Sequence, residues 1–381
     1  MTGSLQVKNG KFYIVLNYKD DNGKRKQKWI TSGLSYKNNR RKAEAMLTEL
    51  IAEHSGTSYI EPSKILLCDY IKDWVHATKT KVQATTYDVY VHMLEKHIYP
   101  YFKPLEITLS NVTPAIIQKY INDKILEGLS PNTAIKQFAI IRSALQEGKK
   151  IKLLNENVCD WVDKPKRTKY YNEYYNAEEI KVLLTVAKGT PIESAILLGA
   201  LGLRRSECIG ARWSAVDFIG CTLTVKHKVV LAKENGVVKI YATDDLKTDS
   251  SYRMLPLDEK LLNYFQNLKT QQDNIRERNG NSHSHEYNDY ICVNELGELI
   301  NPDYVTHYFA KLLKRNNLKK IRFHDLRHSC ASLLLALGYS MKDIQEWLGH
   351  SNYQTTAAYY AHLDPRNKKN MIQGISNAIS I

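Results

Sequence analysis

Alternation between apolar and polar residues organises the first fifty positions. Residues 11–18 alternate with a period of two, as a strand with one buried face does, and residues 24–31 are predicted as a second strand. Between them, residues 20–23 end in Asn-Gly, the strongest short signal for a hairpin turn. Gly33 is expected to begin the exit turn. Residues 40–53 have helical spacing, and the buried side is predicted to consist of Ala45, Met46, Leu47, Leu50 and Ile51. The pattern predicts a small ββ(β)α unit.

Four helical segments follow, at residues 65–77, 85–98, 114–127 and 131–147. Each carries an apolar stripe at spacings of three and four residues, so the four helices can share one core. Thr113 and Ser130 stand at expected N-caps, and a proline follows each of them. The pattern predicts a compact all-helical domain.

The rest of the chain mixes both patterns. Helices are predicted at residues 178–187, 192–201, 261–278, 304–313 and 330–337. Strands are predicted at residues 222–232, 237–243 and 252–257, with a turn around Asn235-Gly236 between the first two. Apolar residues at helical spacing also occur near the end: Met371, Ile372, Ile375, Ala378 and Ile379. That tail needs an apolar partner, either its own domain or a neighbouring subunit. We therefore expect a multidomain α+β protein whose last domain is mainly helical with a small antiparallel sheet.

Two polar stretches mark the expected boundaries. The stretch SGTSYIEPS begins at Ser55, and DKPKRTK begins at Asp163. The expected organisation is a first unit at 1–54, a linker at 55–64, a helical domain at 65–166, a second linker at 167–176 and the last domain at 177–381. At 381 residues the chain is too long for one ordinary core, which agrees with several domains.

Charge points to a polyanionic partner. Lys and Arg exceed Asp and Glu by 14, and residues 1–50 carry eleven basic and four acidic residues. The second predicted strand is a basic ribbon of Lys24, Arg25, Lys26 and Lys28. A two-stranded ribbon fits the major groove of DNA, where cations also meet phosphates. The alternative is an edge strand protected by lysines, but the concentration of charge favours DNA. The basic residues Lys164, Lys166 and Arg167 lie where a linker could follow a duplex.

Other classes of protein are disfavoured. The six cysteines form no CxxC or zinc-finger spacing, so we expect reduced thiols in a cytoplasmic protein without a metal site. No signal-peptide pattern opens the chain, and no apolar run approaches the ~18 residues that a membrane span requires.

Polar residues are unusually dense near the end of the chain. Within about forty residues stand FHDLRH from Phe323, WLGH from Trp347 and TTAAYYAH from Thr355. A core requires the apolar residues of this stretch but not its histidines, its arginine or its tyrosine pair. We interpret the stretch as half of an active site.

These motifs, in their order, resemble those of the tyrosine recombinases. The resemblance rests on the following residues: Gly202-Leu203-Arg204 with Glu207, Lys247, His324 with Arg327, Leu348-Gly349-His350, and a tyrosine two positions before His362. It is strongest over residues 196–364, good over 65–166 and weaker over 1–54. The three-part layout is similar to that of phage and conjugative-transposon integrases. The resemblance implies an arm-site DNA-binding domain at 1–54, a helical core-binding (SAM-like) domain at 65–166 and a catalytic domain at 177–381.

The residue types suit phosphodiester transesterification. Arg204 and Arg327 present forked, permanent charges to phosphate oxygens; the alternative is that they form salt bridges to Glu207 or Asp325. Lys247 is the candidate general acid. Two histidines are also assigned catalytic roles: His324 for proton exchange or phosphate binding, and His350 for donation to a phosphate oxygen. Glu207 is a supporting residue that orients the arginines or His324.

Two tyrosines compete for the nucleophile. Tyr360 lies two positions before His362 and ten after His350, whereas Tyr359 lies nine after His350. The resemblance favours Tyr360, and the alternative nucleophile is Tyr359. A phenol has a pKa near ~10, so either one needs nearby cations and a base in order to attack.

The resemblance implies a site-specific recombinase that integrates and excises a mobile element through a 3′-phosphotyrosyl intermediate, without a cofactor or metal. It also implies a homotetramer on synapsed double-stranded DNA, an excisionase and a DNA-bending host protein. Two alternatives remain open: a type IB topoisomerase-like nicking-closing enzyme, and a non-catalytic DNA-binding regulator on the same scaffold.

Overall fold

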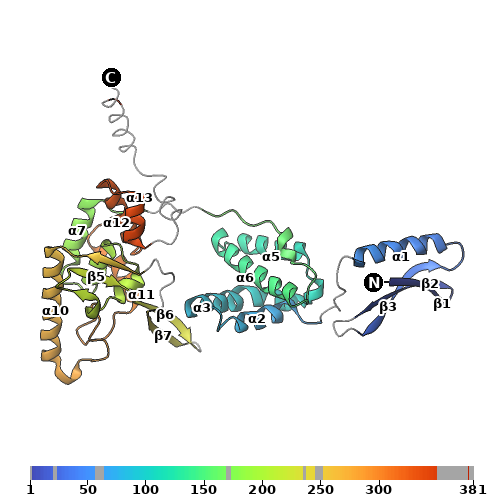
Figure 1. Ribbon diagram of the computed structural model, residues 1–381, viewed down its shortest axis with the longest axis horizontal. Helices are drawn as coiled ribbons and strands as arrows, with labels where there is room; N and C mark the ends of the chain where they lie inside the picture. Colours follow the sequence, from blue (N-terminus) through green and yellow to red (C-terminus); the bar gives the residue numbers. More distant parts are fainter. Residues whose placement is uncertain are drawn as a thin grey trace. The chain divides into compact units, whose positions relative to one another are not determined.

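The computed structural model describes residues 2–19, 24–55, 64–168, 173–234, 237–244, 252–349 and Ser376. The chain divides into two compact units, Met1–Lys169 and Tyr170–Ile381, and Figure 1 shows the elements of each. The predicted turn at 20–23 and the apolar tail at 371–379, apart from Ser376, lie outside the described residues.

The first unit begins with a three-stranded antiparallel sheet and one helix. Strands β1 (Thr2–Lys8), β2 (Lys11–Lys19) and β3 (Arg25–Ser35) pair in the order β1-β2-β3, and helix α1 (Arg40–Ser55) packs against them. Phe12, Ile14 and Leu16 are buried on one face of β2. β1 is the third strand that the sequence pattern left optional.

Two details of the prediction for this region are wrong. Among residues 40–51 of α1, whose burial is described, Ala43 is the buried one, whereas Ala45 and Met46 are exposed. The face toward the sheet follows the helical spacing Ala43, Leu47, Leu50 and Ile51, in which consecutive members are four, three and one residues apart. Gly33 begins no turn, because β3 continues through it to Ser35 with Gly33 in a left-handed conformation, φ +69°.

The remainder of the first unit is helical. Its helices are α2 (Leu67–Ala77), α3 (Ala84–Met93), the π-helix η1 (Leu94–Ile98), α4 (Tyr99–Phe102), α5 (Pro114–Leu126) and α6 (Pro131–Lys150). Short 3₁₀ turns are η2 (Lys103–Leu105), η3 (Leu109–Asn111) and η4 (Val158–Trp161). Apolar stripes from all of the longer helices meet in one core around Ile71, Tyr120 and Ile141. Ser130 caps α6 as predicted, accepting from the Thr133 amide at 3.2 Å, but Thr113 makes no side-chain cap bond.

The second unit surrounds two small sheets with helices. Its helices are α7 (Ala177–Ala187), α8 (Glu193–Ala200), α9 (Arg205–Ile209), α10 (Glu259–Asn279), α11 (Pro302–Arg315), α12 (Asp325–Ala336) and α13 (Met341–Leu348), with 3₁₀ turns η5 (Trp213–Ala215) and η7 (Gly280–Ser282). β4 (Val216–Asp217), β5 (Thr222–Val225) and β8 (Arg253–Pro256) form one antiparallel sheet, and β6 (Lys228–Glu234) pairs with β7 (Val237–Thr243). The core gathers around Leu198, Phe265, Phe309 and Leu326.

One predicted strand, residues 222–232, is two strands in different sheets. β5 ends at Val225, His227 is buried in the break, and β6 begins at Lys228. The alternation continues across the break, so periodicity alone could not show that the chain changes sheets. Among the described residues, no helix is both long enough and apolar enough to cross a membrane.

Candidate active site

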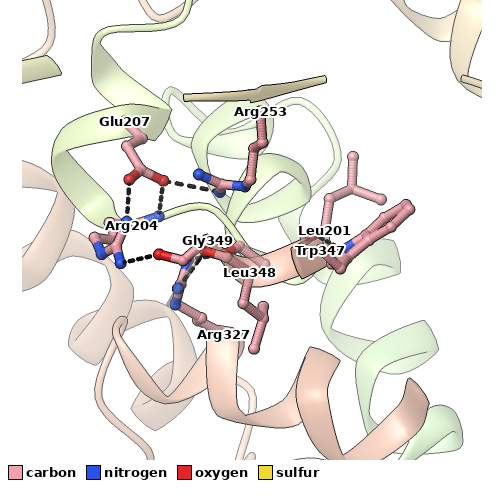
Figure 2. Close-up of polar contacts among 9 residues, drawn as sticks. Leu201, Arg204, Glu207, Arg253, Arg327, Trp347, Leu348 and Gly349 are labelled. Atoms are coloured by element: carbon pink, nitrogen blue, oxygen red, sulfur yellow. Dashed lines mark hydrogen bonds and ion pairs between the residues drawn. The ribbon is translucent and has the colours of Figure 1, made fainter. Parts of the chain in front are cut away.

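Arg204 is placed by a glycine turn that leads into α9. Gly202 has φ +97°, and a Cβ there would lie 2.7 Å from a methyl carbon of Leu348, so both the backbone conformation and the close approach of α13 require glycine. Glu207, in the first turn of α9, accepts from the Arg204 amide at 2.9 Å and from Arg204 Nη1 at 2.6 Å. Figure 2 shows this pair below strand β8.

Arg327 is a core residue of this unit. It lies in the first turn of α12 with only 2% of its surface exposed. Its Nη1 donates to the Gly202 carbonyl at 2.6 Å, and its Nη2 donates to the Leu348 carbonyl at 2.5 Å. Burial and the charge of Arg204 lower the pKa of Arg327 to about 9, which leaves it protonated at neutral pH.

The two arginines meet at the end of α13. Arg204 Nη2 donates to the Gly349 carbonyl at 2.8 Å, one residue beyond the carbonyl that Arg327 contacts (Figure 2). Gly349 ends α13 in a left-handed conformation, φ +65°, and Trp347 Nε1 donates to the Leu201 carbonyl at 2.9 Å. The elements that carry Arg204, Arg327 and the residue before His350 are therefore fixed to one another by hydrogen bonds.

Arg253 was missing from the sequence interpretation. It lies in β8 with 8% exposure, and its Nη2 donates to Glu207 Oε2 at 3.0 Å. Burial alone would raise the pKa of Glu207, but the charges of Arg253 and Arg204 outweigh it and lower that pKa, so the carboxylate stays ionised. The sequence did contain a signal that Arg253 is buried: Arg253, Leu255 and Leu257 alternate as the inward residues of a strand.

The alternative that the two arginines form salt bridges to Glu207 or Asp325 holds only for Arg204. Arg204 pairs with Glu207 at 2.6 Å, whereas Asp325 is bonded by Arg322 at 2.9 Å, and Arg327 donates to two carbonyls instead. A guanidinium that donates two hydrogen bonds to carbonyls still has further N–H groups that can donate to a phosphate.

His324 precedes α12 directly and is exposed, with its ring 5.1 Å from that of His328 at 90°. Desolvation by the surrounding protein and the charge of Arg327 lower the pKa of His324, so the ring is neutral at pH 7. A neutral imidazole can exchange a proton with a phenol or donate one hydrogen bond to a phosphate.

Protonation of His328 is expected to destabilise this unit. Burial and the nearby His324 lower the pKa of His328 to about 4, whereas the unfolded chain takes up the proton near ~6.5. Unfolding therefore becomes easier as pH falls from ~6.5 to ~4, by on the order of 2–3 kcal/mol from this one group. We expect His328→Asn to flatten that part of the pH–stability curve in denaturant unfolding. An unchanged slope would show that other groups carry it.

Four of the predicted site residues are not described by the structure. Lys247, His350, Tyr359 and Tyr360 lie outside the described residues, although Gly349, the neighbour of His350, is part of the arginine cluster. Among the described residues, no group of three or more His, Cys, Asp or Glu side chains is arranged to hold a metal ion.

Strand pairing divides the proposed DNA-binding residues of β3 between the two faces of the sheet. Lys26 pairs with Tyr18 and Lys28 with Leu16, so both lysines lie on the face that α1 covers. Arg25, Gln27 and Trp29 alternate with them and lie on the open face, where Trp29 is 51% exposed. Near the end of this unit, Lys164, Lys166 and Arg167 are exposed, and Lys164 Nζ lies 5.9 Å from the centre of the Phe138 ring.

Comparison with known proteins identifies the family. Residues 173–367 match the phage integrase family, and residues 67–125 match the phage integrase N-terminal SAM-like domain. A tyrosine recombinase XerC-like protein of Caldanaerobacter subterraneus is 27% identical over 397 residues, covering 97% of each chain. The ICEBs1 integrase of Bacillus subtilis is 24% identical over 291 residues, covering 76% of each.

Solved structures share the fold. An integrase of the Tn1549 transposon, in complex with transposon right end DNA, matches 82% of this chain and all of its own at TM-score 0.65 and 19% identity. A lambda integrase dimer bound to a COC′ core site matches 93% of each chain at TM-score 0.52 and 17% identity. Because the family match covers residues 173–367, which is half of the chain and contains the arginine cluster, the chain belongs to the phage integrase family of tyrosine recombinases.

Proposed function

We propose that the protein is a site-specific DNA recombinase that integrates and excises a mobile element by cutting and rejoining DNA strands. One observation supports the proposal most strongly: Arg204 and Arg327 are held together at the end of α13, where Arg204 binds Gly349, the residue that precedes His350 in the sequence. Two permanent cations in a preorganised frame suit the nonbridging oxygens of a phosphate whose charge grows in the transition state.

The reaction needs a nucleophile and a leaving group. In our proposal the Tyr360 oxygen attacks phosphorus and forms a 3′-phosphotyrosyl bond, while the bond to the 5′ oxygen breaks. The phenolic proton passes to a base, for which neutral His324 is suited, and Lys247 protonates the leaving 5′ oxygen. The reverse reaction, with the 5′ hydroxyl of the partner strand, rejoins DNA. The covalent bond conserves the phosphodiester energy, so this scheme uses neither a nucleotide cofactor nor a metal.

Glu207 is proposed as an orienting group. Its carboxylate is almost fully buried and binds Arg204 through both oxygens, with Arg253 on Oε2. A negative charge so enclosed cannot exchange protons readily with substrate, but it can hold a guanidinium in one orientation. His350 completes the proposed phosphate site as a donor.

The division of labour among domains is also a proposal. We assign residues 1–54 to arm-site binding, 65–166 to core-site binding and 177–381 to catalysis, with linkers at 55–64 and 167–176. The exposed cations Lys164, Lys166 and Arg167 would follow the DNA backbone. Two strand exchanges require four active sites, and a lambda integrase tetramer bound to a Holliday junction shares this fold at TM-score 0.52. We propose a homotetramer on synapsed DNA, with an excisionase and a DNA-bending protein as accessory factors, at the nucleoid of a bacterial cell.

The open face of the first sheet is the better candidate for reading bases. Gln27 and Asn17 are neighbours on this face, joined by a 2.9 Å hydrogen bond, and Trp29 stands beside Tyr13 with ring centres 6.4 Å apart. Amide side chains recognise base edges in the major groove. Lys26 and Lys28 lie on the other face, so phosphates are the ligands that suit them better.

We expect the two faces to respond differently to mutation. Gln27→Ala should weaken binding of the full chain to its arm DNA by ~1–3 kcal/mol and relax sequence preference. Lys26→Ala should weaken binding to all sequences alike and reduce the salt slope by about one. Titrations of cognate and scrambled duplexes at several salt concentrations measure both. Equal behaviour of the two variants would refute the assignment of the faces.

A nicked suicide substrate tests the function itself. Cutting it releases a short strand that cannot religate, so a recombinase accumulates as a covalent adduct on DNA from the flanks of its own gene. Absence of any adduct would favour the non-catalytic regulator. An adduct without strand exchange between two sites would favour the topoisomerase-like enzyme.

A further inference from the structure

A cavity of about 490 Å³ lies in the second unit, and none of the residues that line it has a role in the proposed reaction. One wall is α10, which Figure 1 shows at an edge of this unit. A second wall is the loop 283–297, and a third is the segment 189–194 that leads into α8. The volume is typical of binding sites, which measure about 300–1,000 Å³. The apolar part of the lining consists of Leu268, Ile275, Ile291, Val293 and Leu296.

Hydrogen bonds hold the walls of this cavity in place. Gln272 of α10 donates from Nε2 to the Ile291 carbonyl at 2.9 Å, and its Oε1 accepts from Trp213 Nε1 at 2.9 Å. In the loop wall, Cys292 Sγ donates to the Cys208 carbonyl of α9 at 3.2 Å. Because these bonds form without a ligand, the cavity is preformed, and a ligand that enters it pays little for ordering the protein.

Three side chains of the lining carry buried polar atoms that receive no hydrogen bond partner from any described residue. The atoms are Arg276 Nε, His283 Nδ1 and Asn288 Oδ1. His283 is only 8% exposed, so bulk water does not solvate its ring freely. Buried polar atoms are nearly always hydrogen-bonded, and leaving them without partners destabilises a protein. A ligand that supplies partners to this cavity is therefore favoured.

The three atoms together suit a ligand that both donates and accepts hydrogen bonds. Arg276 Nε only donates, Asn288 Oδ1 only accepts, and His283 Nδ1 does one or the other according to its tautomer. An uncharged amide offers an N–H and a carbonyl within one small group. In contrast, a phosphate or carboxylate offers only acceptors, and an ammonium group offers only donors.

Charge also disfavours a phosphate ligand. Arg276 is the only Lys or Arg among the described residues that line the cavity, and its guanidinium is already paired with Asp273. Two carboxylates, those of Glu193 and Glu295, belong to the same lining. A nucleotide or a DNA backbone would meet more negative than positive charge here, so this cavity is not an extension of the DNA-binding surface.

We infer that the cavity binds a short, uncharged segment of a partner protein. An aliphatic side chain of the partner enters between the apolar walls, and its flanking main-chain amides pair with Arg276, His283 and Asn288. Since the Cys292 wall is bonded to α9, the partner is anchored against the helix that follows Arg204. The inference makes no use of DNA cleavage, so it stands or falls separately from the proposed function.

A capped amino acid is the probe for this site. N-acetyl-leucine N′-methylamide, titrated into the full chain with labelled Leu and Ile methyl groups, is expected to bind with a Kd of about 1 mM. The methyl resonances of Leu268, Ile275 and Ile291 should shift most. Free leucine, whose ends are charged, should bind at least ~10-fold more weakly because its charges would lose hydration. If no methyl of the lining shifts at probe concentrations well above that Kd, the inference is wrong.

Two tryptophan variants of α10 test where the probe binds. Gln271 is exposed and lines the cavity, so Gln271→Trp should block the space from its rim and weaken binding at least ~10-fold. Gln266→Trp is the matched control: it makes the same change at an exposed position of the same helix that does not line the cavity. Its affinity should stay within about twofold of the unchanged protein. Equal binding by both variants would overturn the location of the site.

Asn288→Leu tests recognition of the amide. The substitution keeps a side chain of similar shape and removes the acceptor, so we expect binding of the capped leucine to weaken by ~3–10-fold, with thermal unfolding as the check that the variant folds. Unchanged affinity in the folded variant would overturn the amide pairing. Tighter binding of a peptide with residues 368–381 of this chain would assign the cavity to the protein's own tail, and would overturn the inference of a separate partner.

Discussion

Tyr360→Phe is expected to abolish the covalent adduct with DNA and to lower recombination by at least ~10⁴-fold. The substitution removes one oxygen, the atom proposed to attack phosphorus, and leaves an aromatic ring of nearly the same volume. Folding and DNA affinity should therefore be preserved. Gel separation of protein–DNA adducts on a nicked suicide substrate measures the first effect, and an equilibrium binding titration checks the second.

Tyr359→Phe is the matched control, because it makes the same chemical change one residue earlier. We expect an adduct yield within about threefold of the unchanged protein, as for a phenol with a packing role. If the adduct persists in Tyr360→Phe and disappears in Tyr359→Phe, the spacing of nine residues after His350 selects the nucleophile. If both single variants form adducts, the double variant Tyr359→Phe/Tyr360→Phe decides: loss of the adduct shows that either tyrosine can attack, and its persistence shows that the attacking group lies outside this pair.

Arg327→Ala is expected to impair both stability and catalysis. The substitution leaves the Gly202 and Leu348 carbonyls without their donor and opens a void in the core, which should lower the unfolding free energy of the catalytic unit by about 3 kcal/mol. It also removes one charge from the proposed phosphate site, for which a loss of ~10²–10³ in cleavage rate is expected among molecules that remain folded.

Arg327→Lys separates these two contributions. Lysine keeps the charge but cannot bond both carbonyls with the geometry of a guanidinium, so we expect intermediate stability and a cleavage rate still reduced by ~10-fold or more. Denaturant unfolding and single-turnover cleavage, measured on the same preparations, test this. Normal cleavage by a stable Arg327→Ala protein would show that Arg327 is structural and that Arg204 alone meets the phosphate.

Local patterns sufficed for most elements of the fold. The strand at 11–18, the helices of the first unit and the cap at Ser130 follow from periodicity and hydrogen-bonding chemistry that act within a few residues. The break at His227 did not follow, because alternation is the same whether neighbouring residues belong to one sheet or to two. The buried side of α1 was misassigned because several offsets of one helical stripe fit a short apolar run, and only the sheet beneath selects Ala43.

The candidate site likewise contains residues that sequence motifs predicted and residues that only the structure revealed. Arg204, Glu207 and Arg327 were selected from motifs, and the structure brings them together across more than a hundred residues of chain. Arg253 was overlooked because its role depends on its hydrogen bond to Glu207, a residue that is distant in the sequence but adjacent in space. Likewise, a run of Lys24, Arg25, Lys26 and Lys28 looks like one basic surface until strand geometry divides alternate residues between two faces.

The burial of Arg327 affects how an inert version of this protein should be made for structural work. A guanidinium that joins the Gly202 turn to the end of α13 acts as internal scaffolding, so removing it risks altering the shape of the complex to be observed. The hydroxyl oxygen of Tyr360 has no such structural role in our proposal. Assemblies on DNA should therefore be captured with Tyr360→Phe, whereas arginine variants suit questions about how the domain holds together.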